Sequence, residues 1–93
     1  MKNNLNAILI HESDNVVTVT TDLKKGDTLL FQRGDDVIEL VVLEDVPVFH
    51  KVAIADIEKD APVYKYGQLI GKVVMSIAKG NHVHDHNIES PDK

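Results

Sequence analysis

Short apolar runs separated by turn residues make up most of this 93-residue chain. The runs cover residues 7–10, 16–21, 28–32, 37–43, 63–66 and 69–75. They are rich in β-branched side chains, which favour extended backbone. Around residues 16–23 a short helical turn stays open as an alternative, because it would also carry Val16, Val19 and Leu23 inward. Since no stretch keeps a 3.6-residue apolar period for three turns, we expect a mainly β domain with at most short helical turns.

Two tight turns predict β-hairpins. Gly34, which tolerates a positive φ, separates the third run from the fourth. Gly67 lies between the last two runs and predicts a second hairpin. The fourth run, residues 37–43, is apolar enough that we expect both of its faces to be covered. Pro47 offers no amide donor, so strand pairing should break there.

A weak internal repeat suggests that several corners of the fold are alike. Residues 22–29, 56–63 and 76–83 each carry a capping-type residue, a branched apolar residue, a lysine and a turn residue, and then return to apolar side chains. Gly26, Asp60 and Gly80 fall at one position of this repeat. Glycine and aspartate are among the residues best able to adopt left-handed backbone. The repeat therefore predicts similar corners in a compact β fold rather than a solenoid.

Length and composition limit the classes of function. Ninety-three residues form one domain, residues 1–93, with flexible ends expected at 1–6 and 91–93. A net charge of −5 disfavours binding to nucleic acid or to an anionic membrane. The absence of cysteine excludes disulfides and thiolate sites. The early apolar run at 7–10 is too short for a signal peptide or a membrane span, so the cytoplasm is the expected location. A domain this small cannot enclose a large active site, so demanding chemistry would need a second domain or subunit.

Three of the five histidines, His82, His84 and His86, occupy alternate positions near the end of the sequence. In a strand they would share one face, opposite Val83 and Asp85. Such a row of imidazoles suits metal binding, carboxylate binding or proton transfer, although a solvated strand end would have the same pattern. Metal sites of zinc or iron normally need at least three protein ligands, and neither cysteine nor an HExxH pair is present. We therefore expect at most an incomplete metal site that another chain finishes.

Two further pairs are candidates for binding an acidic ligand. His50 and Lys51 open a strand, where they would form either a surface pair or a cationic site for a carboxylate. Lys65 and Tyr66 precede the turn at Gly67, where they would contact a ligand or simply flank a hairpin. The sequence has neither of the glycine-rich spacings of phosphate loops. It also has no recognisable Ser-His-Asp or Cys-His arrangement.

Taken together, three segments resemble the N-terminal SAF domain of the altronate/galactarate dehydratase family of hydro-lyases. They are residues 50–54 (HKVAI), 62–71 (PVYKYGQLIG) and 80–87 (GNHVHDHN). The resemblance extends from Ala7 to Ser90, and it implies a β-clip fold. It also implies a role in dehydrating a sugar acid such as altronate or galactarate, or a related 2-hydroxy acid. Two positions depart from the family pattern: Asp60 stands where glycine is usual, and His82 where a bulky apolar or aromatic residue is common.

The resemblance implies roles for the residues that match. The catalytic candidates are His84 and His86, and the substrate-binding candidates are His50, Lys51, Lys65, Tyr66 and Asn87. We carry no function onto His82, and the metal ligands are not identified. The resemblance further implies Fe²⁺ or another divalent metal in the assembled enzyme, with no cofactor expected on this chain alone.

The family also sets the expected partners. In many members this domain is fused to a much larger catalytic portion, so we expect a small subunit that works with a large catalytic subunit, although an excised domain would look the same. The two-subunit relatives include sulfolactate sulfo-lyases, so the leaving group stays open. A non-catalytic β-clip module that binds an acidic sugar is the alternative, and self-association stays open as well.

Overall fold

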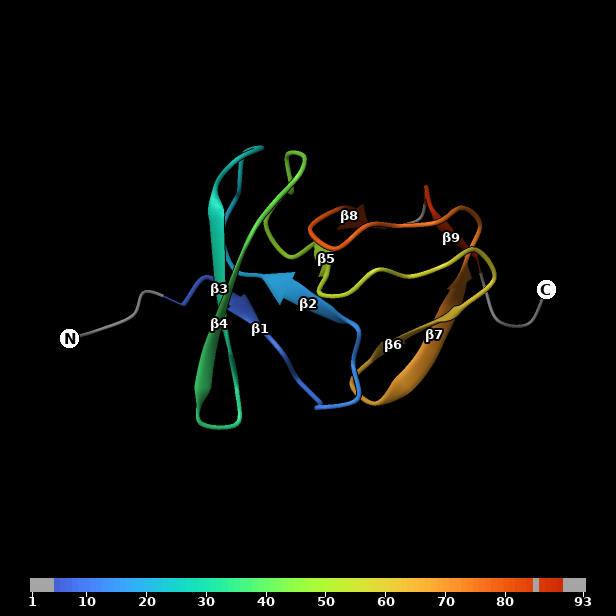
Figure 1. The fold of residues 1–93 in the computed structure, drawn as a ribbon, viewed down its shortest axis with the longest axis horizontal. Helices are drawn as coiled ribbons and strands as arrows, with labels where there is room; N and C mark the ends of the chain where they lie inside the picture. The colour runs from blue at the N-terminus through green and yellow to red at the C-terminus, as the bar shows by residue number, and fades with distance from the viewer. Residues whose placement is uncertain (1–4, 85, 90–93) are drawn as a thin grey trace.

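The computed structural model describes residues 5–84 and 86–89, and within them the chain forms strands and turns without a helix (Figure 1). The strands are β1 (Ala7–Ile8), β2 (Val16–Val19), β3 (Thr28–Arg33), β4 (Asp36–Val41), β5 (Lys51–Ala53), β6 (Pro62–Lys65), β7 (Gln68–Val73), β8 (His82–Val83) and β9 (Ile88–Glu89). The predicted mainly β class is confirmed. The helical alternative around residues 16–23 is wrong, because β2 pairs with neighbours on both sides.

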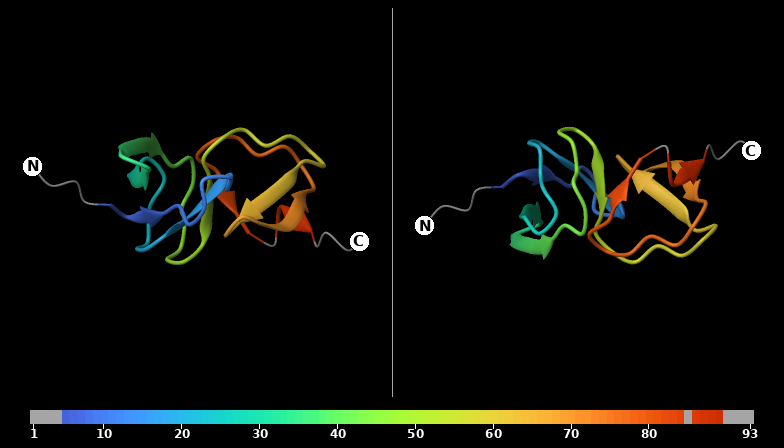
Figure 2. Two further views of the ribbon diagram at one scale, coloured as in Figure 1. Left: turned by 90° about the horizontal axis from the view of Figure 1, so that it is seen from below. Right: turned by 90° about the horizontal axis from the view of Figure 1, so that it is seen from above.

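The strands form three antiparallel sheets. β1, β2, β5 and β8 lie in that order in a central sheet, β3 pairs with β4, and β6, β7 and β9 form the third sheet. In both views of Figure 2 the β3–β4 hairpin lies toward one end of the molecule and the β6–β7 hairpin toward the other. Both predicted hairpins are confirmed, with Gly34 and Gly67 at positive φ in their turns.

The central sheet separates two hydrophobic cores. Val17 of β2 and Val52 of β5 belong to the core that faces the β3–β4 hairpin. Their chain neighbours Val16 and Ala53 belong to the core that faces the β6–β7 hairpin. Since successive side chains of a strand point to opposite faces, β2 and β5 carry adjacent buried residues. This sheet is therefore the part of the fold that is covered on both sides.

The sequence predicted that both faces of residues 37–43 would be covered, and this prediction is wrong. Leu40 and Val42 are buried, but Val37 and Val41 are 40% and 53% exposed. β4 pairs only with β3, and within the described residues the core packs against one face of this hairpin. The apolar side chains of its other face therefore remain on the surface.

The predicted corners share one backbone conformation, and the structure adds a fourth. Gly26, Asp60 and Gly80 all have positive φ, at 93°, 72° and 95°. Phe49 takes the same place in a corner at residues 45–50, with a φ of 70°. In each corner the left-handed residue donates its N–H to the carbonyl of a buried residue on another segment, as Phe49 does to Val19 at 2.8 Å. The fourth copy was missed because a bulky aromatic residue occupies a position that favours glycine.

The four corners form two pairs, and hydrogen bonds from side chain to backbone join the two corners of each pair. The carboxylate of Asp22 accepts the N–H of Val48 at 2.8 Å, and the carboxylate of Asp45 accepts the N–H of Lys25 at 2.9 Å. The same exchange recurs in the other half of the chain, where Asp56 accepts the N–H of Lys79 at 2.8 Å. These pairs fix where β5 and β8 begin, and both strands carry the candidate site.

The start of the described chain is tied to β3. The side-chain amide of Asn6 accepts the N–H of Leu30 at 2.7 Å and donates to the carbonyl of Thr28 at 3.0 Å. The expected flexibility of residues 1–4 and 91–93, and the orientation of Asp85, lie outside the described residues. Within the described part, no helix is long and apolar enough to cross a membrane.

Candidate functional site

The pairing of β5 with β8 brings two distant histidines together. Lys51 lies opposite Val83 and Val52 opposite His82 in this antiparallel ladder. One step further along the same register, His50 faces His84. Their rings stack with centroids 4.0 Å apart and an angle of 19° between their planes. A short strand pair thus places a histidine from the middle of the chain against the histidine-rich segment.

His82 and His86 complete what we call the histidine cluster, which consists of His50, His82, His84 and His86. The Nδ1 atom of His50 and the Nε2 atom of His82 are 2.8 Å apart, within hydrogen-bond distance. The ring of His86 lies 5.0 Å from that of His82, centroid to centroid. The structure therefore gathers both predicted catalytic residues, one predicted substrate-binding residue and His82, to which the sequence gave no role.

The segment that carries three of these rings is a strand end followed by a turn. The continuous strand predicted across residues 82–86 is wrong, because β8 ends at Val83. Asn87, which is 6% exposed, closes the turn: its side-chain oxygen accepts the N–H of His84 at 3.0 Å, and its side-chain nitrogen donates to the carbonyl of His82 at 2.8 Å. The side chain of Asn87 thus holds the backbone of the two histidines that precede it.

The carboxylate of Glu44 binds the backbone and a side chain at the start of β8. Glu44 accepts the N–H of His82 at 3.0 Å and the side-chain amide of Asn81 at 2.9 Å. Burial, reinforced by the nearby imidazoles of His86 and His50, lowers the pKa of His82 below its ordinary value of about 6.5, and Glu44 opposes this shift. The His82 ring is therefore biased toward its neutral form, in which a ring nitrogen has a free lone pair.

The cluster opens to the surface beside a shallow hollow of about 250 Å³. Glu44, His86 and Asn87 line this hollow together with Met75. Met75 is 60% exposed, and Phe49, the chain neighbour of His50, is 71% exposed. These are the two most exposed large apolar side chains of the described residues. Met75 thus places an exposed apolar side chain at the hollow, and Phe49 places another directly before His50 in the chain.

Three residues of the cluster fit a metal ion. One ring nitrogen each of His50, His82 and His84 lies within 4.8 Å of the other two. Two nitrogens bound to one ion at 2.1 Å lie roughly 3.0 Å apart at a right angle and 3.4 Å apart in a tetrahedron. The 2.8 Å between His50 and His82 is slightly shorter than this range, and His84 would need to approach by roughly 2 Å or less. This chain thus holds three candidate ligands, although the sequence predicted an incomplete set.

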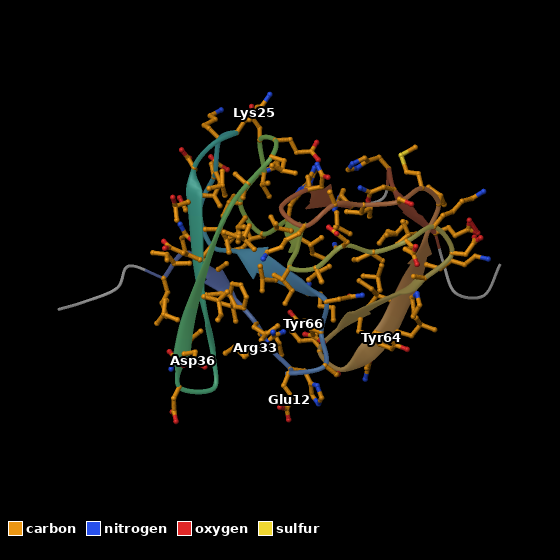
Figure 3. The ribbon with its side chains drawn as sticks, in the orientation of Figure 1. Glu12, Lys25, Arg33, Asp36, Tyr64 and Tyr66 are labelled. Carbon is orange, nitrogen blue, oxygen red and sulfur yellow. The ribbon has the colours of Figure 1, made fainter. Side chains whose placement is uncertain are left out.

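The remaining substrate-binding candidates lie in other settings. Lys51 is half-buried in the central sheet, between Thr18 of β2 and Val83 of β8. Lys65 and Tyr66 lie at the β6–β7 turn, where the Lys65 ammonium sits 4.8 Å from the centroid of the Tyr66 ring. Tyr66 lies in the lower half of Figure 3, whereas β8 lies in the upper half of the same view in Figure 1. The structure therefore does not bring this pair to the histidine cluster.

Sequence reasoning also missed Asp14, whose carboxylate holds the β6–β7 turn. Asp14 is 3% exposed, and its carboxylate accepts the N–H groups of Tyr66 at 2.8 Å and Gly67 at 2.7 Å. It also accepts the N–H of His11 at 3.2 Å. Asp14 followed a glutamate and a serine in what looked like an ordinary polar turn, so nothing in its local sequence distinguished it.

Comparison with known proteins gives consistent matches. Residues 5–91 match the family model of the altronate/galactarate dehydratase SAF domain. The chain is 35% identical over 86 residues to the (2R)-sulfolactate sulfo-lyase subunit alpha of Chromohalobacter salexigens, which covers 88% of this chain and 92% of that subunit. It is 41% identical over 80 residues to altronate dehydratase of Escherichia coli, covering 86% of this chain and 15% of that enzyme. Galactarate dehydratase (L-threo-forming) of the same organism is 33% identical over 87 residues, covering 91% of this chain and 15% of the enzyme.

Proposed function

Since the chain belongs to the altronate/galactarate dehydratase SAF domain family, we propose that it is the small subunit of a two-subunit lyase acting on a 2-hydroxy acid. The observation that carries the proposal is the histidine cluster, in which His86 lines a surface hollow together with the exposed side chain of Met75. A catalytic site in this position would need a second protein to exclude water and to supply the missing groups. The similarity to a protein named subunit alpha, over 92% of its length, supports a partner of this kind.

The reaction classes of the relatives share one chemical core. Sulfolactate and the sugar acids carry a hydroxyl group on the carbon next to the carboxylate and a leaving group on the following carbon. Elimination removes the proton from the first of these carbons and breaks the bond from the second carbon to the leaving group. The resulting enol rearranges to a 2-oxo acid. Such a reaction needs a base, a positive group near the developing enediolate and an acid for the leaving group.

The histidine cluster can supply part of this set. His84 and His86 are the proposed proton carriers, since imidazole gains and loses a proton near neutral pH. Lys51, the first residue of β5, and His50 directly before it would bind the substrate carboxylate, while Asn87 keeps the turn in place. Lys65 and Tyr66 would contact substrate only if the large subunit extends the site to the β6–β7 turn.

A divalent metal, with Fe²⁺ as the first candidate, would supply Lewis-acid polarisation of the substrate oxygens in the assembled enzyme. The residues of this chain that fit such an ion are His50, His82 and His84. With His50 and His84 bound to the ion, Lys51 would bind the substrate carboxylate and His86 would carry the proton.

Between the two leaving groups, we favour the sulfonate. The relative with a sulfo-lyase name aligns with this chain over 92% of its own length, whereas the dehydratases align over 15% of theirs. Dehydration of a sugar acid is the second candidate, supported by the 41% identity to altronate dehydratase. In both cases the chain would bind the shared 2-hydroxy carboxylate, and the partner would determine which group leaves.

The test is to co-purify the chain with its native large subunit and assay the complex on (2R)-sulfolactate, altronate and galactarate. We expect sulfite release from sulfolactate, and no turnover of any of these acids by the 93-residue chain alone. Formation of a 2-oxo acid from a sugar acid instead would support the second candidate. Turnover by the isolated chain would refute the proposal. A stable complex inactive on all three acids would also refute it, and it would favour a binding module.

Variants then test the proposed proton carriers. His84→Ala and His86→Ala should each lower kcat/KM of the complex by about 10²–10⁴-fold. His11→Ala is the matched control, because His11 is the one histidine of the chain outside the cluster, and it should leave kcat/KM unchanged. Equal losses in all three variants, or losses that follow the fraction of unfolded protein, would show that these histidines are structural.

A further inference from the structure

We infer that this chain binds a divalent transition-metal ion by itself, through His50, His82 and His84. The inference goes beyond the proposed lyase function, because it requires neither the large subunit nor a substrate. It also gives a role to His82, where the sequence departs from the family pattern. The ligand class follows from the donors: three imidazoles without a thiolate suit Fe²⁺, Co²⁺, Ni²⁺, Cu²⁺ or Zn²⁺ rather than Mg²⁺ or Ca²⁺.

The geometry of the three rings carries the inference. A single hydrogen bond would account for the 2.8 Å contact between His50 and His82. The ring of His84 lies against His50, with centroids 4.0 Å apart, and places a third nitrogen within 4.8 Å of the other two. Around one cation each of the three imidazoles can contribute a nitrogen lone pair.

The backbone around the rings is fixed in advance. His82 is held in the β5–β8 ladder and His50 directly precedes this ladder, whose residues Val52 and Val83 are fully buried. The turn that carries His84 is closed by the buried side chain of Asn87. Because the ligands come from a rigid pair of strands and a bonded turn, little conformational entropy would be lost when an ion binds.

Local charge favours a cation at this place. Glu44 lies directly behind His82 and accepts its backbone N–H at 3.0 Å. A nearby carboxylate stabilises a positive ion bound to the ring nitrogens without being a ligand itself. Since three protein ligands leave coordination positions open, a water or the oxygens of a 2-hydroxy acid would complete the shell.

The experiment uses the purified 93-residue chain, stripped with EDTA and then titrated with Co²⁺ or Zn²⁺ by isothermal calorimetry. We expect saturable binding of one ion per chain. His50→Gln, His82→Gln and His84→Gln should each weaken binding by at least about tenfold, since the loss of an outer-shell partner alone costs about 10–100-fold. His11→Gln should bind as the parent chain does, and His86→Gln should bind within about threefold of it, because His86 is outside the ligand set.

A readout on the unsubstituted chain guards against variants that fail to fold. In the ¹⁵N spectrum of the imidazoles, added Zn²⁺ should shift one ring nitrogen of each of His50, His82 and His84 and leave His11 unchanged. No saturable binding, equal weakening by His11→Gln, or shifts confined to other histidines would overturn the inference. Metal binding with a lyase-inactive complex would refute the proposed function alone, and an active complex whose small subunit binds no metal would refute this inference alone.

Discussion

Replacing Gly80 with alanine should destabilise the domain more than the same replacement at Gly26, although both glycines occupy equivalent corners. Their φ angles are 95° and 93°, so the backbone strain on an alanine is the same at both positions. The surroundings differ. A Cβ at Gly26 would meet no atom within 4 Å, whereas a Cβ at Gly80 would lie 2.7 Å from the carbonyl oxygen of Val41 and 3.2 Å from the side chain of Leu43.

The magnitudes follow from these two terms. Left-handed backbone costs an L-residue about 1–2 kcal/mol, and the lower entropy of the unfolded alanine chain offsets about 0.4–1 kcal/mol of this. Gly26→Ala should therefore lower the free energy of unfolding by about 1 kcal/mol. At Gly80 the carbonyl of Val41 must also move, and forced overpacking costs a further 1–3 kcal/mol or so. That movement is resisted, because the N–H of Leu43 donates to the carbonyl of Gly80 at 2.9 Å.

Urea denaturation followed by far-ultraviolet circular dichroism measures both variants. We expect Gly80→Ala to lose about 1–3 kcal/mol more than Gly26→Ala, with the same dependence on urea concentration. The difference cancels the strain that the corners share, so it reports the close contacts with Val41 and Leu43. If the two variants lose stability equally, within about 0.5 kcal/mol, the close approach of residue 80 to β4 does not limit this corner.

Two further predictions concern the β6–β7 turn, which Asp14 holds, and the pKa of His82 in the histidine cluster. Asp14→Asn should lower the free energy of unfolding by about 1–3 kcal/mol. The reason is that the three backbone N–H groups bind both oxygens of the carboxylate, and an amide has only one acceptor oxygen. A loss below about 0.5 kcal/mol in urea denaturation would contradict this interpretation. In metal-free protein the free energy of unfolding should fall as the pH is lowered from about 6.5 through the depressed pKa of His82. The reason is that the unfolded imidazole takes up a proton before the folded one does, so the stability is complete above about pH 6.5 and the loss levels off below the folded pKa. His82→Gln should flatten this decline in urea titrations between about pH 8 and 5 with EDTA present, and an unchanged slope would show that His82 does not carry it.

Local backbone requirements made part of the fold predictable. A turn that needs positive φ selects glycine or aspartate whatever surrounds it, so Gly34, Gly67 and the corners at Gly26, Asp60 and Gly80 were found from sequence alone. Phe49 shows the limit of this reasoning. Its φ of 70° is imposed by its hydrogen bond to Val19 and by the neighbouring corner, and neither can be read from residues 45–50.

Coverage of a sheet face depends on tertiary packing, and there the sequence misled. Residues 37–43 are more continuously apolar than β2, yet β2 is buried on both faces and β4 on one. The difference lies in position, since β2 is in the middle of the central sheet and β4 pairs only with β3. Val37 and Val41 are exposed because β4 has this position, and a single sequence does not show which strand will have it.

The candidate site shows the same division between local and distant information. The alternation of His82, His84 and His86 predicted that their rings would lie together, and they do, but the reason is a turn closed by Asn87 rather than a continuous strand. His50 is 32 residues from His82, and no spacing rule joins them.

Their meeting follows from the repeat itself. The corner at residues 45–50 launches β5 and the corner that contains Gly80 launches β8, so two like corners deliver their strands side by side, each with a histidine directly after its left-handed residue or two positions beyond it. A repeat whose copies end in histidines therefore brings these rings together where two copies pair, although neither copy holds the whole histidine cluster.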